Sequence, residues 1–262
     1  MILVYSRDNR ISNSIGTELI REFGFERDAE TGSTVTFVSG DKTLVEIRGD
    51  ATHADFLDAE FDTDCFVFLY SHFSAAKVPA MTVHPEGNWS DDNSIGGLPK
   101  ELSCAAPVQM FSALHNLNAN RVEGVEVTYE ATHHGPLLKT PSFFMELGGT
   151  DSQEQIEALT KAMAISAFGM LVSKKVPKVV VLGIGGGHYP RKFTRMAIEE
   201  GVAFSHIMSK HSIDRVEMIG QAISRSEPKP SKALIEWKSL DSNQRKKVTE
   251  ELDNLSIEYE RV

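Results

Sequence analysis

Short apolar runs of strand length alternate with helical patterns along this chain, and this alternation constrains the fold more than any other feature. The run Val179–Ile184 (VVVLGI) is typical of a buried strand. The segment Gln153–Val172 carries apolar residues at helical spacing, and a capping-box sequence, Thr150–Glu154 (TDSQE), lies at its start. We therefore predict an α/β fold with a mostly parallel, mixed central sheet and helices on both faces.

The expected elements are spread along the chain, which we predict to form a single α/β domain over residues 1–262. A polar, glycine-rich stretch predicts a long loop or insertion at about 85–102, and a proline-broken link precedes a C-terminal helix–strand extension at about 232–262. Strands are expected at Ile2–Tyr5, Val35–Val38, Leu44–Ile47, Cys65–Tyr70, Ala80–Val83, Val125–Ala131, Val179–Ile184, Val202–Ile207 and Ile257–Val262, and helices at Ile11–Phe23, Ala105–Leu117, Gln153–Val172, Arg191–Glu199 and Asp241–Asn254.

The net charge of −10 argues against broad contact with nucleic acid, and we expect no DNA partner. The charge is uneven, however. Residues 1–170 hold 11 Lys and Arg against 25 Asp and Glu, whereas residues 171–262 hold 16 against 12. The final third can therefore present a local basic face to a polyanion, although ordinary surface charge accounts for the same count.

Composition also bears on the cellular compartment. No run approaches the roughly 18 apolar residues that cross a bilayer, so we expect no membrane span. The first residues, MILVYSRDNR, are typical of a strand rather than of a signal peptide. The chain has two cysteines, Cys65 and Cys104, and no CxxC, which argues against a disulfide framework or a cysteine zinc site. Together these features predict a cytoplasmic protein.

The strand Val179–Ile184 runs into the glycine loop GIGGGHYP. Its pattern excludes a GxGxxG dinucleotide fingerprint, which would need glycine where this chain has His188, and a P-loop, which would need GK[ST]. In open α/β sheets ligands bind beyond the carboxyl ends of the strands, so Gly185, Gly186 and Gly187 can cradle an anion with their N–H groups. A tight strand–helix turn explains the same glycines.

Histidines gather at or just past the predicted carboxyl ends of strands, where scattered surface histidines would not concentrate. They are His72, His84, His134, His188 and His206. In YEATHHGP, a regular strand would turn Glu130, Thr132 and His134 to one face and His133 to the other. A carboxylate close to an imidazole suits a metal site or a general base, and Glu146 adds a second carboxylate. Which of His133 and His134 faces the site stays open, as does a purely structural role for either.

Several motifs now occur together in one chain: MTVHPEGN, ELSCAAP, THHGP, PSFFMELGG, GIGGGHY and FSHI. Together they resemble the D-aminoacyl-tRNA deacylases of the archaeal and plant type, over about Ser71 to His206. Two positions depart from that pattern. Phe73 stands where the family leads us to expect a basic residue, and Ser205 where it leads us to expect glycine.

The resemblance implies hydrolysis of the ester between a D-amino acid and the 3′-end of tRNA, on a fold similar to phosphorylase/hydrolase-like and peptidyl-tRNA-hydrolase-like proteins. It implies zinc (Zn²⁺) as cofactor and the acceptor end of D-aminoacyl-tRNA as partner, with the protein a monomer or homodimer. On this basis we assign catalytic roles to Glu130, Thr132, His133 and His134, substrate binding to His72, Ser74, Asn88, Gly185, Gly186, Gly187, Arg191 and His206, and metal binding to His84, His134, Glu146 and His188.

Specific roles follow from that resemblance. His134 would act as the base with Glu130 as its orienting partner, and N–H groups of the glycine loop would hold the terminal phosphate or the oxyanion. Rejection of L-amino acids needs a rigid block on one side, which close backbone at Gly186 or at Gly135–Pro136 would supply. Three alternatives stay open: a zinc-dependent amidohydrolase or peptidase, a nucleoside-phosphorylase-like enzyme, and a tRNA- or nucleotide-binding module without activity.

Overall fold

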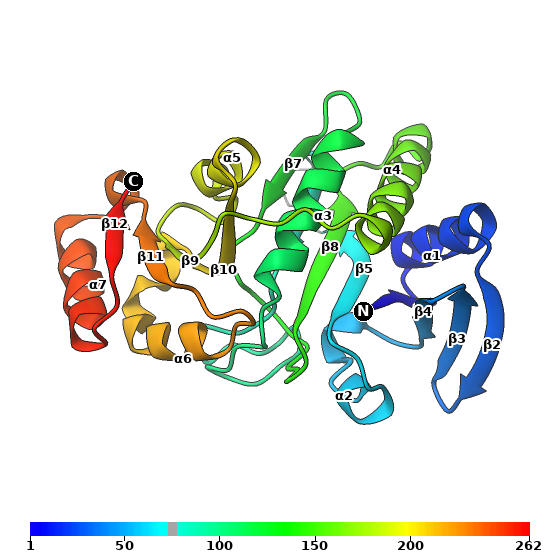
Figure 1. Cartoon of the computed structure of the whole chain (residues 1–262), viewed down its shortest axis with the longest axis horizontal. Coiled ribbons are helices and arrows are strands. Elements are labelled where there is room, and N and C mark those ends of the chain that lie inside the picture. Colours follow the sequence, from blue (N-terminus) through cyan, green and yellow to red (C-terminus); the bar gives the residue numbers. More distant parts are fainter. Residues whose placement is uncertain (73–77) are drawn as a thin grey trace.

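The computed structural model describes residues 1–72 and 78–262, and for His72 the backbone alone (Figure 1). Within these residues, eight strands form a mixed sheet and four form a smaller parallel sheet. The mixed α/β class is confirmed, whereas the division into two sheets was not predicted.

The larger sheet has the order β2-β3-β4-β1-β5-β8-β6-β7, with β1 Ile2–Ser6, β2 Glu26–Thr31, β3 Thr34–Ser39, β4 Lys42–Ile47, β5 Phe66–His72, β6 Ala80–His84, β7 Glu126–Tyr129 and β8 Ser142–Gly148. The smaller has the order β10-β9-β11-β12, with β9 Val179–Ile184, β10 Val202–Met208, β11 Lys232–Ile235 and β12 Tyr259–Arg261.

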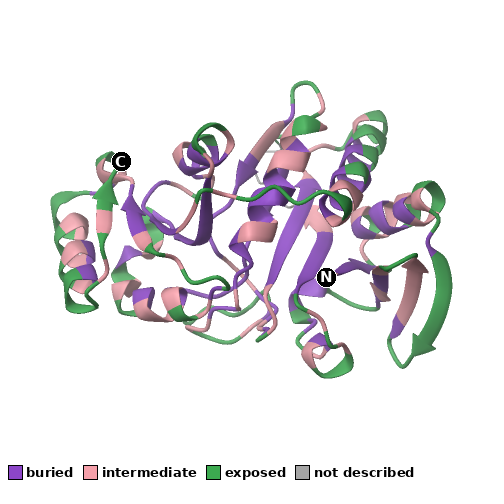
Figure 2. Cartoon of the chain, viewed as in Figure 1, coloured by how far each residue is buried: buried purple, intermediate pink, exposed green. Residues whose placement is uncertain are grey.

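The centre and the edge of the larger sheet differ in burial. Every residue of β1 is buried, and β1 pairs in parallel with β4 and β5 on its two sides. Such strands are apolar on both faces because both faces of the sheet are covered. At the edge, β2 (ERDAET) is exposed along its whole length (Figure 2). Its charges make the edge a poor template for further strand pairing, and they also hid this strand from a search for apolar runs.

Helices cover one face of the larger sheet. They are α1 (Arg10–Phe23), α3 (Pro107–Ala119) and α4 (Gln153–Val172), whose apolar side chains join those of the strands in the largest core cluster. The opposite face is covered by α2 (Leu57–Glu60) and by loops that contribute Leu138 and neighbouring apolar residues. Loops rather than long helices on that face leave room for a site between them.

Among the described residues, α4 is the one helix long and apolar enough to cross a membrane. Half of that stretch (50%) is buried within the protein, where α4 packs against α1 and α3. Burial on this scale is typical of the core helix of a globular protein.

The smaller sheet has its own apolar core. Side chains of β9 and β11 pack against α6 (Ile219–Ser224) and α7 (Ser242–Asn254), while α5 (Arg191–Glu200) connects β9 to β10. The two sheets meet where the chain leaves β7. There the N–H of Ala131 donates to the carbonyl of His188 at 2.8 Å, and the N–H of Thr132 donates to the carbonyl of Ile207 at 3.0 Å.

The direction of β6 positions the site. β5 runs parallel to β8, whereas β6 runs antiparallel to it, so His72 lies opposite Gly148 and His84 lies opposite Phe144. The ends of β5 and β6 therefore point to opposite edges of the sheet. Since β7 runs parallel to β6, the residues that follow Tyr129 emerge beside His84.

Candidate active site

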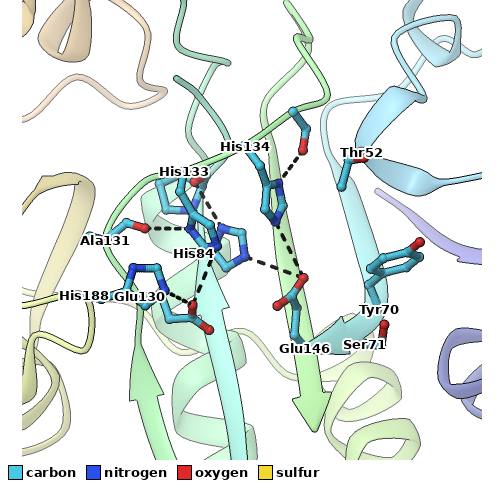
Figure 3. Close-up of polar contacts among 12 residues, drawn as sticks. Thr52, Tyr70, Ser71, His84, Glu130, Ala131, His133, His134, Glu146 and His188 are labelled. Atoms are coloured by element: carbon cyan, nitrogen blue, oxygen red, sulfur yellow. Dashed lines mark hydrogen bonds and ion pairs between the residues drawn. The ribbon is translucent and has the colours of Figure 1, made fainter. Parts of the chain in front are cut away.

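Three histidine rings meet at this junction. His84 ends β6, and His133 and His134 follow β7 (Figure 3). The ring centroid of His84 lies 4.1 Å from that of His133 and 4.9 Å from that of His134, and the latter two lie 4.4 Å apart. Their potential ligand atoms all lie within 4.8 Å of one another. The spacing is short enough for a single small ion or a polarised water to contact all three rings.

The Nδ1 atom of each ring faces a backbone carbonyl. The distances are 3.3 Å from His84 to Pro85, 2.9 Å from His133 to Ala131 and 2.6 Å from His134 to Gly135. Because a carbonyl can only accept, Nδ1 is the donor in each contact, and in a neutral ring this leaves the lone pair on Nε2. The Nε2 atom of His84 is buried and has no hydrogen-bond partner in the described part of the chain. Histidines that bind metals are held in this way.

Two buried carboxylates flank the rings. Glu146 of β8 places Oε1 3.8 Å from Nε2 of His84 and 3.8 Å from Nε2 of His134. On the other side, Oε2 of Glu130 lies 2.7 Å from Nε2 of His188 and 3.7 Å from Nε2 of His133. The expected pairing of Glu130 with His134 is therefore wrong: Glu130 is held by His188 and faces His133, while Glu146 accompanies His134.

The chain departs from a regular strand before it reaches these histidines. β7 ends at Tyr129, and His134 has φ 43°, in the left-handed region that non-glycine residues seldom adopt. Gly135 allows this turn to pack tightly, because a Cβ there would lie 2.3 Å from the nitrogen of Gly97. Alternation along an extended strand would separate the two rings. The turn instead brings both His133 and His134 to His84.

The surroundings of His133 set its protonation. The pKa of His133 lies well below its ordinary value of 6.5, first because burial disfavours the charged form and then because His84 and His134 would add positive charge nearby. His133 is therefore neutral near pH 7.

A cavity of about 520 Å³ opens onto the cluster. This volume falls in the range of sites for small ligands and nucleosides. His133, His134 and His188 line one side, and the loop after β6 and the segment after β10 line the rest. The other lining residues are Gly87, Asn88, Trp89, Ser90, Asp92, Ser94, Ile95, Ala131, Thr132, Ser209, His211, Ser212, Asp214 and Arg215.

His206 lies apart from this cluster, in a closed network. Its ring is fully buried, and Nε2 lies 3.1 Å from the carbonyl of Ser103 and 2.9 Å from that of Arg225. Nε2 therefore carries the proton, and Nδ1 accepts from the hydroxyl of Thr132 at 3.2 Å. Burial lowers the pKa of His206 to about 4. Both ring nitrogens are satisfied, so His206 and the Thr132 hydroxyl join loops rather than face a substrate.

The glycine loop is bonded to its own surroundings. The N–H of Gly185 donates to the carbonyl of Met208 at 2.8 Å, and the N–H of Gly186 donates to Oγ of Ser239 at 2.8 Å. Both glycines have positive φ, 101° and 77°, which explains their identity as turn residues. Their N–H groups are thus committed within the protein, and the expected anion cradle at Gly185 and Gly186 is not what the structure shows. The cavity lining does not include Gly187.

The other residues that were assigned to substrate binding do not lie together. The guanidinium of Arg191 contacts both oxygens of Glu126, at 2.8 and 3.0 Å. The amide of Asn88 donates to two carbonyls of its own loop while lining the cavity. The backbone of His72 ends β5 at the opposite edge of the sheet, and Ser74 lies outside the described residues.

The cavity also includes His211, which lies shortly after the end of β10 and was not among the residues predicted for the site. Its position after a strand was the same signal that singled out His84 and His188. Four other residues of its segment line the cavity as well, but nothing in their sequence pattern distinguishes them from surface residues: Ser209, Ser212, Asp214 and Arg215.

Comparison with known proteins identifies the family of this chain. The profile of the D-aminoacyl-tRNA deacylases matches residues 59–260. A D-aminoacyl-tRNA deacylase of Pyrococcus furiosus is 32% identical, and one of Staphylothermus marinus is 30% identical, each over 98% of this chain and 98% of its own. A solved structure of a conserved protein of unknown function, AF0625, superposes with a TM-score of 0.87 at 26% identity, covering 99% of this chain and 94% of that one. With its fold, its histidine cluster and these matches, the chain belongs to the D-aminoacyl-tRNA deacylase family.

Proposed function

We propose that this protein hydrolyses the ester that joins a D-amino acid to the 3′-terminal ribose of tRNA, and that it binds the acceptor end of that tRNA. Membership of the family supports the reaction. The observation that carries it is the cluster of imidazoles and buried carboxylates beside a cavity of nucleoside size. An aminoacyl ester is already activated, so a positioned water and a base suffice to cleave it.

His133 is the base in this proposal. With its Nδ1–H held by the carbonyl of Ala131, Nε2 is free to take a proton from water. The water oxygen bonds to the ester carbon, the bond to O3′ breaks, and the proton passes from His133 to O3′. Glu130, 3.7 Å away and held by His188, stabilises the imidazolium while it exists. Glu130 faces the nitrogen that takes the proton, so it acts on His133 by its charge, while the carbonyl of Ala131 orients the ring.

The residues around Glu146 fit a zinc ion. His84 and His134 offer Nε2 lone pairs with their Nδ1–H groups fixed by carbonyls, and Glu146 offers an oxygen to both. Two histidines and a glutamate form an established donor set for catalytic zinc, and the buried, unpartnered Nε2 of His84 is the observation that favours an ion. When bound, zinc would polarise the ester carbonyl or the attacking water. His188, first expected in this set, bonds Glu130 instead.

The phosphorylase alternative loses its main support. It requires the glycine loop to hold phosphate, but Gly185 and Gly186 donate their N–H groups within the protein.

The cytoplasm is the compartment we propose, since both cysteines are free.

The function is tested by single-turnover deacylation of D-tyrosyl-tRNA and L-tyrosyl-tRNA, before and after chelation and with zinc restored. The expected result is rapid loss of the D-ester alone, abolished by chelator and recovered with zinc. Loss of neither ester would reject the proposed activity. Rapid loss that survives chelation would leave the reaction to His133 and Glu130 without a metal.

A further inference from the structure

The carboxyl ends of the smaller sheet form one continuous edge. The N–H of Lys210, after β10, donates to the carbonyl of Gly186, after β9, at 2.9 Å. The N–H of Trp237, after β11, donates to the carbonyl of Val262, after β12, at 3.1 Å. The side chain of Gln244 in α7 donates to the carbonyl of Lys210 at 3.0 Å. Segments distant in sequence are thereby brought side by side at the end of the molecule that holds the C-terminus (Figure 1).

Four cations at this edge have no carboxylate partner among the described residues: Lys210, Lys238, Arg245 and Arg261, here called the basic edge. Their neighbours differ, since Lys232 pairs with Glu260 and Lys247 pairs with Asp214. Lys210, Lys238 and Arg261 are exposed. Unpaired, exposed cations are available to an external anion.

Trp237 holds two of these cations in place. The guanidinium of Arg261 lies 4.0 Å from the centre of the indole, and that of Arg245 lies 5.0 Å from it. Nε of Arg245 also donates to the carbonyl of Trp237 at 3.0 Å. Stacking on an aromatic face orders a guanidinium without neutralising it. The basic edge therefore presents charge that is ordered before any ligand arrives.

Two carboxylates also lie on this edge. Asp241 is used as the N-cap of α7, where it accepts from the N–H of Gln244 at 2.8 Å. Glu236 is directed toward the glycine loop, since a Cβ at Gly186 would lie 2.6 Å from its Oε2. Neither forms an ion pair with the four cations in the described structure, and four cations against these two carboxylates leave the edge with a net positive charge.

The basic edge adjoins the cavity. Lys210 lies between Ser209 and His211, which both line it, and its N–H bond to Gly186 ties it to the loop that leads to His188. A chain carrying −10 overall repels RNA, so contact with a polyanion needs a concentrated positive surface near the site.

We propose that the basic edge binds the phosphodiester backbone of the tRNA acceptor stem while the 3′-terminal nucleoside occupies the cavity. This rests on the proposed function, and it adds a surface that determines affinity for tRNA rather than the rate of ester cleavage. Arginine and lysine bind backbone phosphates without reading sequence, which suits an enzyme that must accept many tRNAs.

The test compares two triple variants with the same change in charge. Lys210→Gln with Lys238→Gln and Arg261→Gln alters the basic edge and spares Arg245, which bonds the backbone. The control is Lys174→Gln with Lys175→Gln and Lys178→Gln, three exposed lysines that precede the amino end of β9 and so lie toward the opposite edge. Each is assayed on D-tyrosyl-tRNA and on 3′-O-D-tyrosyl-adenosine, with binding of uncharged tRNA measured across a salt series.

For the basic-edge variant, KM for D-tyrosyl-tRNA and Kd for uncharged tRNA should rise at least about tenfold, and the slope of log Kd against log salt should fall by about two. Its hydrolysis of the adenosine ester and its kcat should stay within about twofold of wild type. The control should match wild type throughout. Equal tRNA affinity of the two variants would overturn the proposal. If wild type cleaved neither ester, the proposed function would fail, and the binding series would still decide on the surface.

Discussion

The histidine cluster and the His206 network use the same residue type, also beside a strand end, for opposite purposes. At His84, His133 and His134, Nδ1 faces a carbonyl, and Nε2 forms no hydrogen bond within the described part of the chain. At His206, both nitrogens have partners within the protein. The difference shows that a histidine at a strand end is available for chemistry only when its second nitrogen lacks a protein partner.

The largest expected effect is on activity in the cluster. Replacing His134 with Asn should lower single-turnover hydrolysis of D-tyrosyl-tRNA about 10³-fold, because a proposed zinc ligand is lost. Stability should change by no more than about 1 kcal/mol, since Asn tolerates the left-handed backbone at this position. The control is His53→Asn, at an exposed histidine outside the cavity, which should keep wild-type kinetics. Wild-type kinetics for His134→Asn would remove His134 from the site.

For the His206 network we expect the opposite result, a loss of stability with little loss of activity. His206→Ala should lower the free energy of unfolding by about 3 kcal/mol, because it opens a cavity and leaves the Thr132 hydroxyl and two carbonyls unsatisfied. The rate constant of the folded enzyme should stay within about fivefold of wild type. Denaturant unfolding gives the first quantity and single-turnover kinetics at low temperature the second. A loss of rate as large as that of His134→Asn, with stability intact, would show that His206 also takes part in the reaction.

The same network should make stability depend on pH. The folded-state pKa of His206, about 4, lies below the ordinary 6.5, so the unfolded chain takes up a proton that the folded protein refuses. Stability therefore falls as pH drops from about 6.5 to about 4, by about 3 kcal/mol at most from this residue. His206→Asn lacks this contribution, so its deficit relative to wild type should shrink between pH 7 and pH 4.5. A deficit that stayed constant across this interval would mean that His206 is not buried as a neutral ring.

The smallest effect concerns the glycine loop. Gly186→Ala should cost about 1–2 kcal/mol of stability, because φ is 77° and the new Cβ would meet Oε2 of Glu236. The sequence-based hypothesis that Gly186 excludes L-amino acids predicts weaker cleavage of the D-ester. The structure leads us to expect an unchanged preference for the D-ester instead, since Gly186 does not line the cavity. Kinetics of both enantiomers measure this, and a changed ratio would restore the earlier hypothesis.

Much of the fold could be predicted because apolar runs and helical spacing mark buried elements directly. The exposed strand β2 and the short strand β11 escaped prediction, since neither has a long apolar run. The smaller sheet escaped for a related reason. Its assembly depends on pairing β11 with β9 across about fifty residues, which no local pattern encodes.

The site was predictable in its residue types and less so in its pairings. His84, His134 and Glu146 were placed together from strand ends and family motifs, and the structure brings them together. The predicted pairing of Glu130 with His134 was wrong because β7 ends early and the backbone of His134 adopts the left-handed conformation. His206 resembled its neighbours in sequence, and only the distant carbonyls of Ser103 and Arg225 set it apart.

The most direct test measures His134→Asn and His206→Asn side by side, with D-tyrosyl-tRNA cleavage and unfolding free energy taken from the same preparations. We expect a double dissociation. His134→Asn should lose about 10³-fold in rate with near wild-type stability, and His206→Asn should lose stability while its folded fraction keeps most of the rate. Equal losses of rate in both variants, or none in His134→Asn, would contradict the assignment of chemistry to the open cluster.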